Sequence, residues 1–214
     1  MDIAIVGAGN FGSAFARLAR QAGHTVTVSE SAAGEQRLRD VAAETGASRA
    51  PTARAVAAAR LTVLAVPFGA VEAVCTPEVV AAAAGKIVVD VTNPLGPDRR
   101  SLASGHTTSA AEQIAHRLPG SHVVKAFNTL LARNLTTTAP GGSRLLVPVA
   151  GDDTDAKSAV LALALELGFD AVDVGPLASA RYLEPVVVLL LQLAQDADRA
   201  AGRSVEIGLA LARG

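Results

Sequence analysis

A glycine-rich segment near the start of the chain has residue types and spacing that suit phosphate binding. Gly7, Gly9 and Gly12 follow the apolar run 2–6 and precede a stretch with apolar residues at helical spacing. In such a strand–loop–helix unit, the first glycine permits a tight turn, the second lets a pyrophosphate approach the backbone, and the third allows the helix to pack on the strand. The positive end of the helix then faces the phosphates. The segment predicts a dinucleotide site formed by Gly7, Ala8, Gly9, Asn10, Phe11 and Gly12.

The ribose end of this site is predicted at the residues that follow the next apolar run, 25–29. Glu30 stands 23 positions after Gly7, near the spacing at which an acid accepts hydrogen bonds from an unphosphorylated ribose and repels a 2′-phosphate. Ser29 and Ser31 flank the acid, and Ser31 could donate to a phosphate, as could Arg37 from the next predicted helix. Glu30 slightly favours NAD, NADP stays open, and a solvated loop acid is the alternative.

Alternating strand-like and helix-like runs place this loop in a larger α/β fold. Strands are expected at 3–6, 25–29, 61–66, 86–91, 122–126, 145–150 and 171–174, and helices at 35–45, 52–59, 69–84, 109–117 and 154–167. Ser109 and Glu112 form a predicted capping box. This alternation predicts a doubly wound, mostly parallel Rossmann-type sheet over residues 1–174. The remainder, 175–214, is expected to be a helical extension with helices at 182–200 and 205–212. This extension is expected to help close the active site over the substrate and to form much of a homodimer interface.

Composition excludes several other classes. Lys and Arg number 19 against 20 Asp and Glu, so the net charge of −1 gives no reason to expect nucleic acid or an anionic membrane as partner. One cysteine and four histidines without ligand spacing predict no disulfide and no metal site. The longest apolar run, 186–191, is shorter than the roughly 20 residues of a membrane span, and no basic leader precedes the first strand. A cytoplasmic location is expected.

The segments after the predicted strands are the expected place for the reacting ring, because ligands of open α/β sheets bind beyond the carboxyl ends of the strands. These segments combine apolar walls with hydroxyl and amide groups, which suits a nicotinamide. They are Val66, Pro67 and Phe68 after one strand, Thr92, Asn93 and Pro94 after the next, and Phe127, Asn128, Thr129 and Leu130 after a third. Turn formation by Asn-Pro and a core position for Phe127 are the structural alternatives. Lys125 could donate a proton here or be a structural charge.

Taken together, several segments resemble the coenzyme F420-dependent NADP oxidoreductases. They are the glycine loop, 88–95, 109–112, 124–129, 151–153 and 173–177, and their order and spacing agree over almost the whole chain. Members of that family pass a hydride between a nicotinamide and the deazaflavin ring of coenzyme F420, and the cytoplasmic domains of the STEAP metalloreductases share a similar Lys-Ala-Phe-Asn-Thr segment. The resemblance implies an oxidoreductase that uses NAD(P)H and a small molecule or deazaflavin. A reductase of a small carbonyl, imine or alkene without F420, and a nonenzymatic NAD(P)-binding sensor or subunit, are the alternatives.

The resemblance also implies particular roles for residues. It implies catalytic positions at Lys125, Asn128 and Thr129 and substrate contacts at Phe127, Leu130 and Leu177. Similar proteins pair through their C-terminal helices, so a homodimer is expected in which Val187 or Leu190 meets the partner's copy of the same helix. The chain departs from the family after its second strand, where NADP-specific members usually carry Ser-Arg and this chain has Ser29-Glu30.

Overall fold

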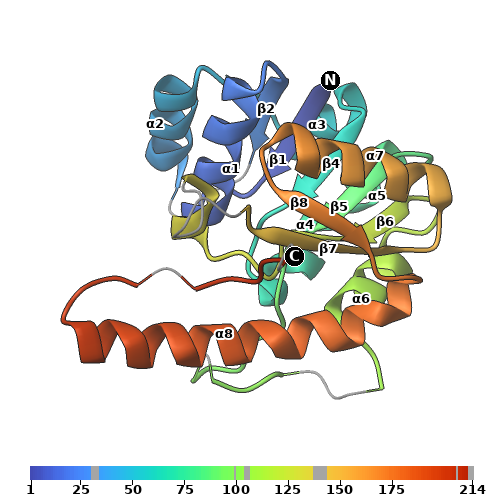
Figure 1. Cartoon of the computed structure of the whole chain (residues 1–214). Coiled ribbons are helices and arrows are strands. Elements are labelled where there is room, and N and C mark those ends of the chain that lie inside the picture. Colours follow the sequence, from blue (N-terminus) through green and yellow to red (C-terminus); the bar gives the residue numbers. More distant parts are fainter. Residues whose placement is uncertain (30–33, 99, 104–106, 137–143, 206, 212–214) are drawn as a thin grey trace.

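The computed structural model describes the chain except for residues 30–33, 99, 104–106, 137–143, 206 and 212–214. Eight strands form one sheet in the order β3-β2-β1-β4-β5-β6-β7-β8 (Figure 1). The strands from β3 to β6 in this order are parallel, β7 is antiparallel to β6, and β8 is parallel to β7. The predicted doubly wound, mostly parallel sheet is therefore confirmed.

The predicted strands and most predicted helices are present within two residues at each end. The strands are β1 Asp2–Val6, β2 Thr25–Ser29, β3 Ser48–Arg49, β4 Leu61–Leu64, β5 Ile87–Asp90, β6 His122–Lys125, β7 Leu146–Gly151 and β8 Asp170–Asp173. The α-helices are α1 Asn10–Gln21, α2 Glu35–Thr45, α3 Thr52–Ala58, α4 Val71–Val74, α5 Pro77–Ala83, α6 Ala110–Arg117, α7 Thr154–Glu166 and α8 Ala180–Ala201. Short 3-10 segments are η1 Phe68–Ala70, η2 Ala132–Thr136 and η3 Leu177–Ser179. Sequence reasoning missed β3, because its two exposed polar residues give no apolar signal.

Two apolar clusters lie on the two faces of the sheet. Helices α1, α2 and α7 bury one cluster, which includes the rings of Phe15, Phe127 and Phe169. Helices α3, α5 and α6 bury the other, which includes Val56 and Ile114. Because both faces are covered, polar groups are concentrated at the ends of the strands, where the site is expected.

The helix predicted at 69–84 is interrupted. It consists of η1, α4 and α5, and the break falls between Val74 and Pro77. Pro77 has no backbone N–H to continue α4 but suits the first position of α5. The hydroxyl of Thr76 accepts from the backbone N–H of Val79 at 3.4 Å and caps α5. The Thr-Pro pair is the sequence signal for this break.

The C-terminal extension contains one long helix instead of two. Helix α8 covers the predicted 182–200, but the prediction of a helix at 205–212 is wrong for the described residues of that range. The backbone N–H of Leu146 donates to the carbonyl of Leu209 at 2.8 Å, and Leu145 forms an isolated β-bridge with Ala210. Pairing with the start of β7 therefore overrides the local helical pattern.

Helix α8 runs beneath the sheet, past the loops at the carboxyl ends of its strands (Figure 1). Among the described residues, the stretch Leu177–Ala201 is long and apolar enough to cross a membrane by length and composition alone. The uninterrupted apolar run within this helix, 186–191, is as short as the sequence indicated. A core helix passes the same test, and α8 carries the buried Glu184.

Candidate active site

The three positions of the glycine loop lack a side chain for two different reasons. A Cβ on Gly7, whose φ is +115°, would overlap the carbonyl oxygen of Ala65, and a Cβ on Gly12 would overlap the carbonyl oxygen of Gly7. Packing of α1 and β4 on β1 thus requires these two glycines. Gly9 has φ −73° and ψ −171°, and a Cβ there would meet no atom within 4 Å. The missing side chain of Gly9 leaves space outside the protein, where a ligand can approach.

The first turn of α1 is open to an anion. Its N-cap, Gly9, makes no side-chain hydrogen bond, and no acid lies in its first turn. By contrast, Thr76, Ser109 and Asp153 cap α5, α6 and α7 with side-chain oxygens, and the predicted capping box is confirmed. The uncapped N–H groups and the positive helix end of α1 fit a pyrophosphate. Of the other loop residues, Ala8 is buried, Asn10 is exposed and Phe11 stacks on the core ring of Phe15.

Arg37 lies beside the dinucleotide loop. Its Nη2 donates to the hydroxyl of Ser13 at 3.1 Å, and that hydroxyl donates to the carbonyl of Gly9 at 2.7 Å. Within the described part of the chain, no carboxylate forms an ion pair with Arg37. Ser29 is buried, and its Oγ has no hydrogen-bond partner among the described residues. Glu30 and Ser31 lie outside the described residues.

The ends of β5 and β6 are joined by two asparagines. Asn93 Nδ2 donates to the backbone carbonyl of Asn128 at 3.1 Å, and Asn128 Nδ2 donates back to Asn93 Oδ1 at 3.0 Å. The side-chain oxygens of Thr92, Asn128 and Thr129 are buried and have no hydrogen-bond partner among the described residues. Unpartnered buried polar groups are costly, so such a cluster suits a ligand with its own amide or hydroxyl groups. The residues of this cluster are among those that the sequence analysis placed after the two strands.

Lys125, at the end of β6, is completely buried and lies in a network of charges. Its Nζ donates to Asp90 Oδ2 at 2.8 Å, to Glu184 Oε1 at 2.8 Å and to the backbone carbonyl of Thr92 at 2.7 Å. The three ammonium hydrogens are therefore used within the protein. This geometry supports the structural alternative for Lys125 over that of a proton donor.

Sequence reasoning missed the two acids of this network. Asp90 ends an apolar strand, and Glu184 is the one acid in the apolar stretch 183–191. An acid isolated among apolar residues is a signal for a buried, paired charge.

The remaining predicted site residues differ in how deeply their side chains are buried. Phe127 is fully buried, with its ring edge-on to Phe15 and Phe169, and Leu130 and Leu177 are also buried in the core. These side chains have almost no free surface in the structure, and their role as substrate contacts stays a prediction. Three residues near the sheet edge, Val66, Pro67 and Phe68, are half-buried or exposed, and Pro94 is buried.

Phe127 also has the left-handed φ of +61°, the one positive φ recorded for a non-glycine residue in the described chain. This sharp turn after β6 sends the ring into the core. A strained backbone at the point where Asn128 follows is typical of a functional loop.

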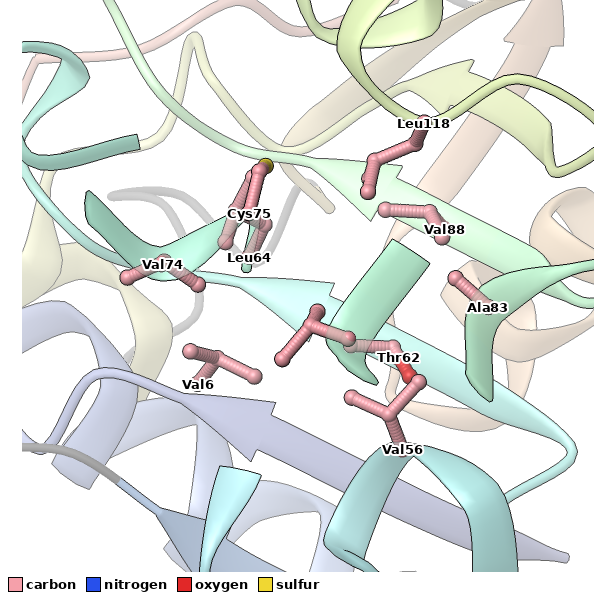
Figure 2. A pocket seen from close by; sticks show the side chains of 10 residues that line it. Val6, Val56, Thr62, Leu64, Val74, Cys75, Ala83, Val88 and Leu118 are labelled. Carbon is pink, nitrogen blue, oxygen red and sulfur yellow. The ribbon is translucent and has the colours of Figure 1, made fainter. Parts of the chain in front are cut away.

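An internal cavity lies elsewhere, between β1, β4, β5 and the helices α3 to α5 (Figure 2). It has room for about one water molecule. Its lining is apolar except for Thr62 and Cys75, and burial raises the pKa of the Cys75 thiol. The cavity reaches Val6, the residue before the glycine loop, but none of the loop residues 7–12 lines it. In the described part of the chain, no group of three or more His, Cys, Asp or Glu could hold a metal ion.

The fold, together with the polar groups at the carboxyl ends of β5 and β6, defines a class of protein. The sheet order from β3 to β6 is that of the dinucleotide-binding doubly wound fold, and ligands of that fold lie where the strand order reverses, beside β1. Together with the open glycine loop, this arrangement is that of an NAD(P)-dependent oxidoreductase.

Comparison with known proteins identifies the family within that class. The family model for NADP oxidoreductase, coenzyme F420-dependent, matches residues 2–94. The crystal structure of a candidate F420-dependent NADP reductase from Arthrobacter sp. FB24 is 30% identical with a TM-score of 0.86, and the similarity covers 100% of both chains. The chain belongs to the coenzyme F420-dependent NADP oxidoreductase family.

Two further relatives are similar over smaller parts. Metalloreductase STEAP3 of Rattus norvegicus is 41% identical over 108 residues, which are 50% of this chain and 21% of the relative. The matched region thus spans about a fifth of that curated relative. An imine reductase from Myxococcus stipitatus in complex with NADP+ is 19% identical with a TM-score of 0.68 over 94% of this chain and 67% of its own. That likeness shows the fold alone.

Proposed function

We propose that the protein transfers a hydride between NAD(P)H and the deazaflavin coenzyme F420. The observation that carries this proposal is the similarity over the full length of both chains to the candidate F420-dependent NADP reductase from Arthrobacter. In the reducing direction NAD(P)H is oxidised and the deazaflavin takes up one hydride and one proton from water. Bound F420 supplies the ring carbon that accepts the hydride.

The residues of this chain would act mainly by binding and orientation. The first turn of α1, reached over Gly9, would hold the pyrophosphate. Thr92, Asn93 and Asn128 would orient the nicotinamide through the polar atoms at the ends of β5 and β6. Thr129 lies in the same cluster. Hydride transfer between two rings requires a dry, aligned stack and does not require an acidic side chain of the protein. The ammonium of Lys125 agrees with this, because its three hydrogens are all donated within the protein.

For the dinucleotide, two groups act in opposite directions. The carboxylate of Glu30 would favour the unphosphorylated ribose of NAD, whereas the guanidinium of Arg37, next to Ser13 and without a carboxylate partner in the described chain, would attract a 2′-phosphate. We therefore propose that the site accepts both NADH and NADPH.

Rapid mixing of the purified protein with NADPH or NADH and oxidised F420 tests the proposed function. We expect the deazaflavin absorbance to fall in step with oxidation of the nicotinamide, with no third substrate. No deazaflavin reduction with either dinucleotide, while the same protein reduces small carbonyls, imines or alkenes, would refute the role of F420 and support the alternative reductase. Binding of dinucleotide without any turnover would support the nonenzymatic alternative.

We also propose a homodimer formed through α8, but with a different contact face from the one expected. Val187 and Leu190 are 3% and 5% exposed and pack within their own chain, so their predicted contact with a partner is wrong. An apolar stripe on the outer face of α8 comprises Tyr182, Leu189 and Leu193, which are 76%, 56% and 47% exposed. Spacings of seven and four residues place these side chains along one side of the helix.

Light scattering tests this assembly. We expect a mass of twice the 21.6 kDa chain at micromolar concentration, and the single chain mass for a Leu189→Asp/Leu193→Asp variant. As a control, Leu165→Asp changes an exposed leucine on α7 and should leave the dimer intact. A wild-type protein of single chain mass would refute the dimer.

A further inference from the structure

We propose that Glu184 of α8 is a positioning residue for the nicotinamide ring and acts through Lys125 and Asp90. The inference rests on the proposed dinucleotide site and adds the C-terminal helix to it. No residue of the glycine loop belongs to this network, so we expect a change at Glu184 to leave binding of the adenosine half of the cofactor unaffected.

The carboxylate of Glu184 joins three parts of the fold. Its Oε1 accepts from Lys125 Nζ at 2.8 Å, and its side chain is 3% exposed. On its other side, Oε2 accepts from the backbone N–H of Ala110 at 3.0 Å and Oε1 from that of Ala111 at 3.3 Å. These are the first two residues of α6, so the negative charge lies at the positive end of that helix. One side chain of α8 thus fixes α6 and the end of β6 together.

The network then reaches Thr92 on the predicted ring-binding edge. Lys125 Nζ donates to the carbonyl of Thr92 at 2.7 Å, and Asp90 Oδ1 accepts from the backbone N–H of Thr92 at 2.8 Å. Both backbone polar groups of Thr92 are therefore held by members of the network. Its hydroxyl, in contrast, is one of the buried groups without a partner in the described chain.

The same turn of α8 holds the second residue of that edge. Asn128 Nδ2 donates to the carbonyl of Leu183 at 3.3 Å, next to Glu184 in the chain. The position of α8 thus determines where Thr92 and Asn128 present their unpartnered oxygens.

Stability alone does not account for this network. Two carboxylates and one ammonium are removed from water, and well-packed apolar residues of similar volume are often as stabilising as a buried ion pair. Charged hydrogen bonds do, however, fix directions that apolar contacts leave free. A group that must be set to within about 0.5 Å of a reacting ring benefits from this directionality.

Glu184→Gln tests the proposal, because it keeps the side-chain volume and removes the charge. Titrations would use NADPH together with 2′-phospho-ADP-ribose, and NADH together with ADP-ribose; each second ligand lacks the nicotinamide ring. We expect Kd for NADPH and NADH to rise about tenfold and the fluorescence enhancement of the bound dihydronicotinamide to be lost. Kd for the two ring-less ligands should stay within about twofold.

The matched control is Arg181→Gln. Arg181 also joins α8 to α6, through an ion pair with Glu112 in which its Nε donates to Oε2 at 2.8 Å, but it has no link to Lys125. We expect this variant to bind all four ligands as the wild type does. Should Glu184→Gln fail to fold, Asp90→Asn, which retains the acceptor for the N–H of Thr92, is titrated in the same way.

Equal weakening of dinucleotides and ring-less ligands in Glu184→Gln would overturn the proposal, as would an Arg181→Gln variant with the same selective loss. A wild-type protein that binds ADP-ribose and its 2′-phosphate as tightly as NADH and NADPH would also overturn it, since the ring then makes no contribution. A wild-type protein that binds none of the four would instead refute the dinucleotide site, and this inference with it.

Discussion

Replacement of Gly9 by valine should abolish dinucleotide binding and leave the fold intact. A Cβ at Gly9 meets no atom within 4 Å, and the extended backbone there is open to any residue. Replacing glycine restricts the unfolded chain and so stabilises the folded protein by about 0.4–1 kcal/mol. Loss of a good N-cap residue destabilises the folded protein by about the same amount. The free energy of unfolding should therefore change by less than about 1 kcal/mol, which for a chain of this size is about 2–4 °C in Tm.

The binding loss should be far larger than the change in stability. The two methyl groups would occupy the approach of the pyrophosphate to the first turn of α1, and we expect an affinity loss of at least about 100-fold, or about 2.7 kcal/mol. Isothermal titration calorimetry with NADH and NADPH, beside a thermal melt of the same sample, measures both quantities.

Gly12→Ala is the matched counterpart in the same loop. Its new Cβ would overlap the carbonyl oxygen of Gly7, so α1 must move away from β1 at a cost of about 1–3 kcal/mol. A lowered Tm is therefore expected for Gly12→Ala and an almost unchanged one for Gly9→Val. A folded Gly9→Val protein with wild-type affinity for either dinucleotide would refute the assignment of the loop.

Three further predictions concern stability, acid sensitivity and cofactor choice. Thr62→Val replaces a buried hydroxyl without a partner in the described chain and should raise the free energy of unfolding by about 1 kcal/mol in urea denaturation; a decrease would contradict the orphaned hydroxyl. The hydrogen bond from Arg181 holds the pKa of Glu112 below its ordinary 4.5, so the stabilisation from this pair is present above that pH and is lost as pH falls through the lowered pKa. The stability difference between wild type and Glu112→Gln should therefore shrink when denaturation is repeated at about pH 3 instead of about pH 6, and an unchanged difference would refute this assignment. Glu30→Ser should shift the ratio of kcat/KM values toward NADPH by about tenfold, or about 1.4 kcal/mol, and Arg37→Gln should shift it toward NADH; constant ratios would show that neither side chain faces the ribose.

Local sequence patterns were enough to predict most helices and strands and the candidate dinucleotide loop. Strands such as β2, and helices such as α2, follow from apolar periodicity within a few residues, and the capping box of α6 is a signal four residues long. The loop of Gly7, Gly9 and Gly12 was also predictable, because the glycine spacing that phosphate binding requires lies within a few consecutive residues. The polar edge at Thr92 and Asn128 was predictable too, since the carboxyl ends of parallel strands meet on one side of a sheet.

Which of these residues are free to meet a ligand or a partner depends on packing between distant segments. Lys125 and Glu184 are 59 positions apart, so no local pattern shows that the ammonium is fully engaged. Phe127 is in the core because Phe15 and Phe169 approach it from other elements. Val187 is buried and Leu189 exposed because α8 packs on the body along one side. Burial and pairing depend on what lies across the fold, and periodicity along one segment carries no information about that.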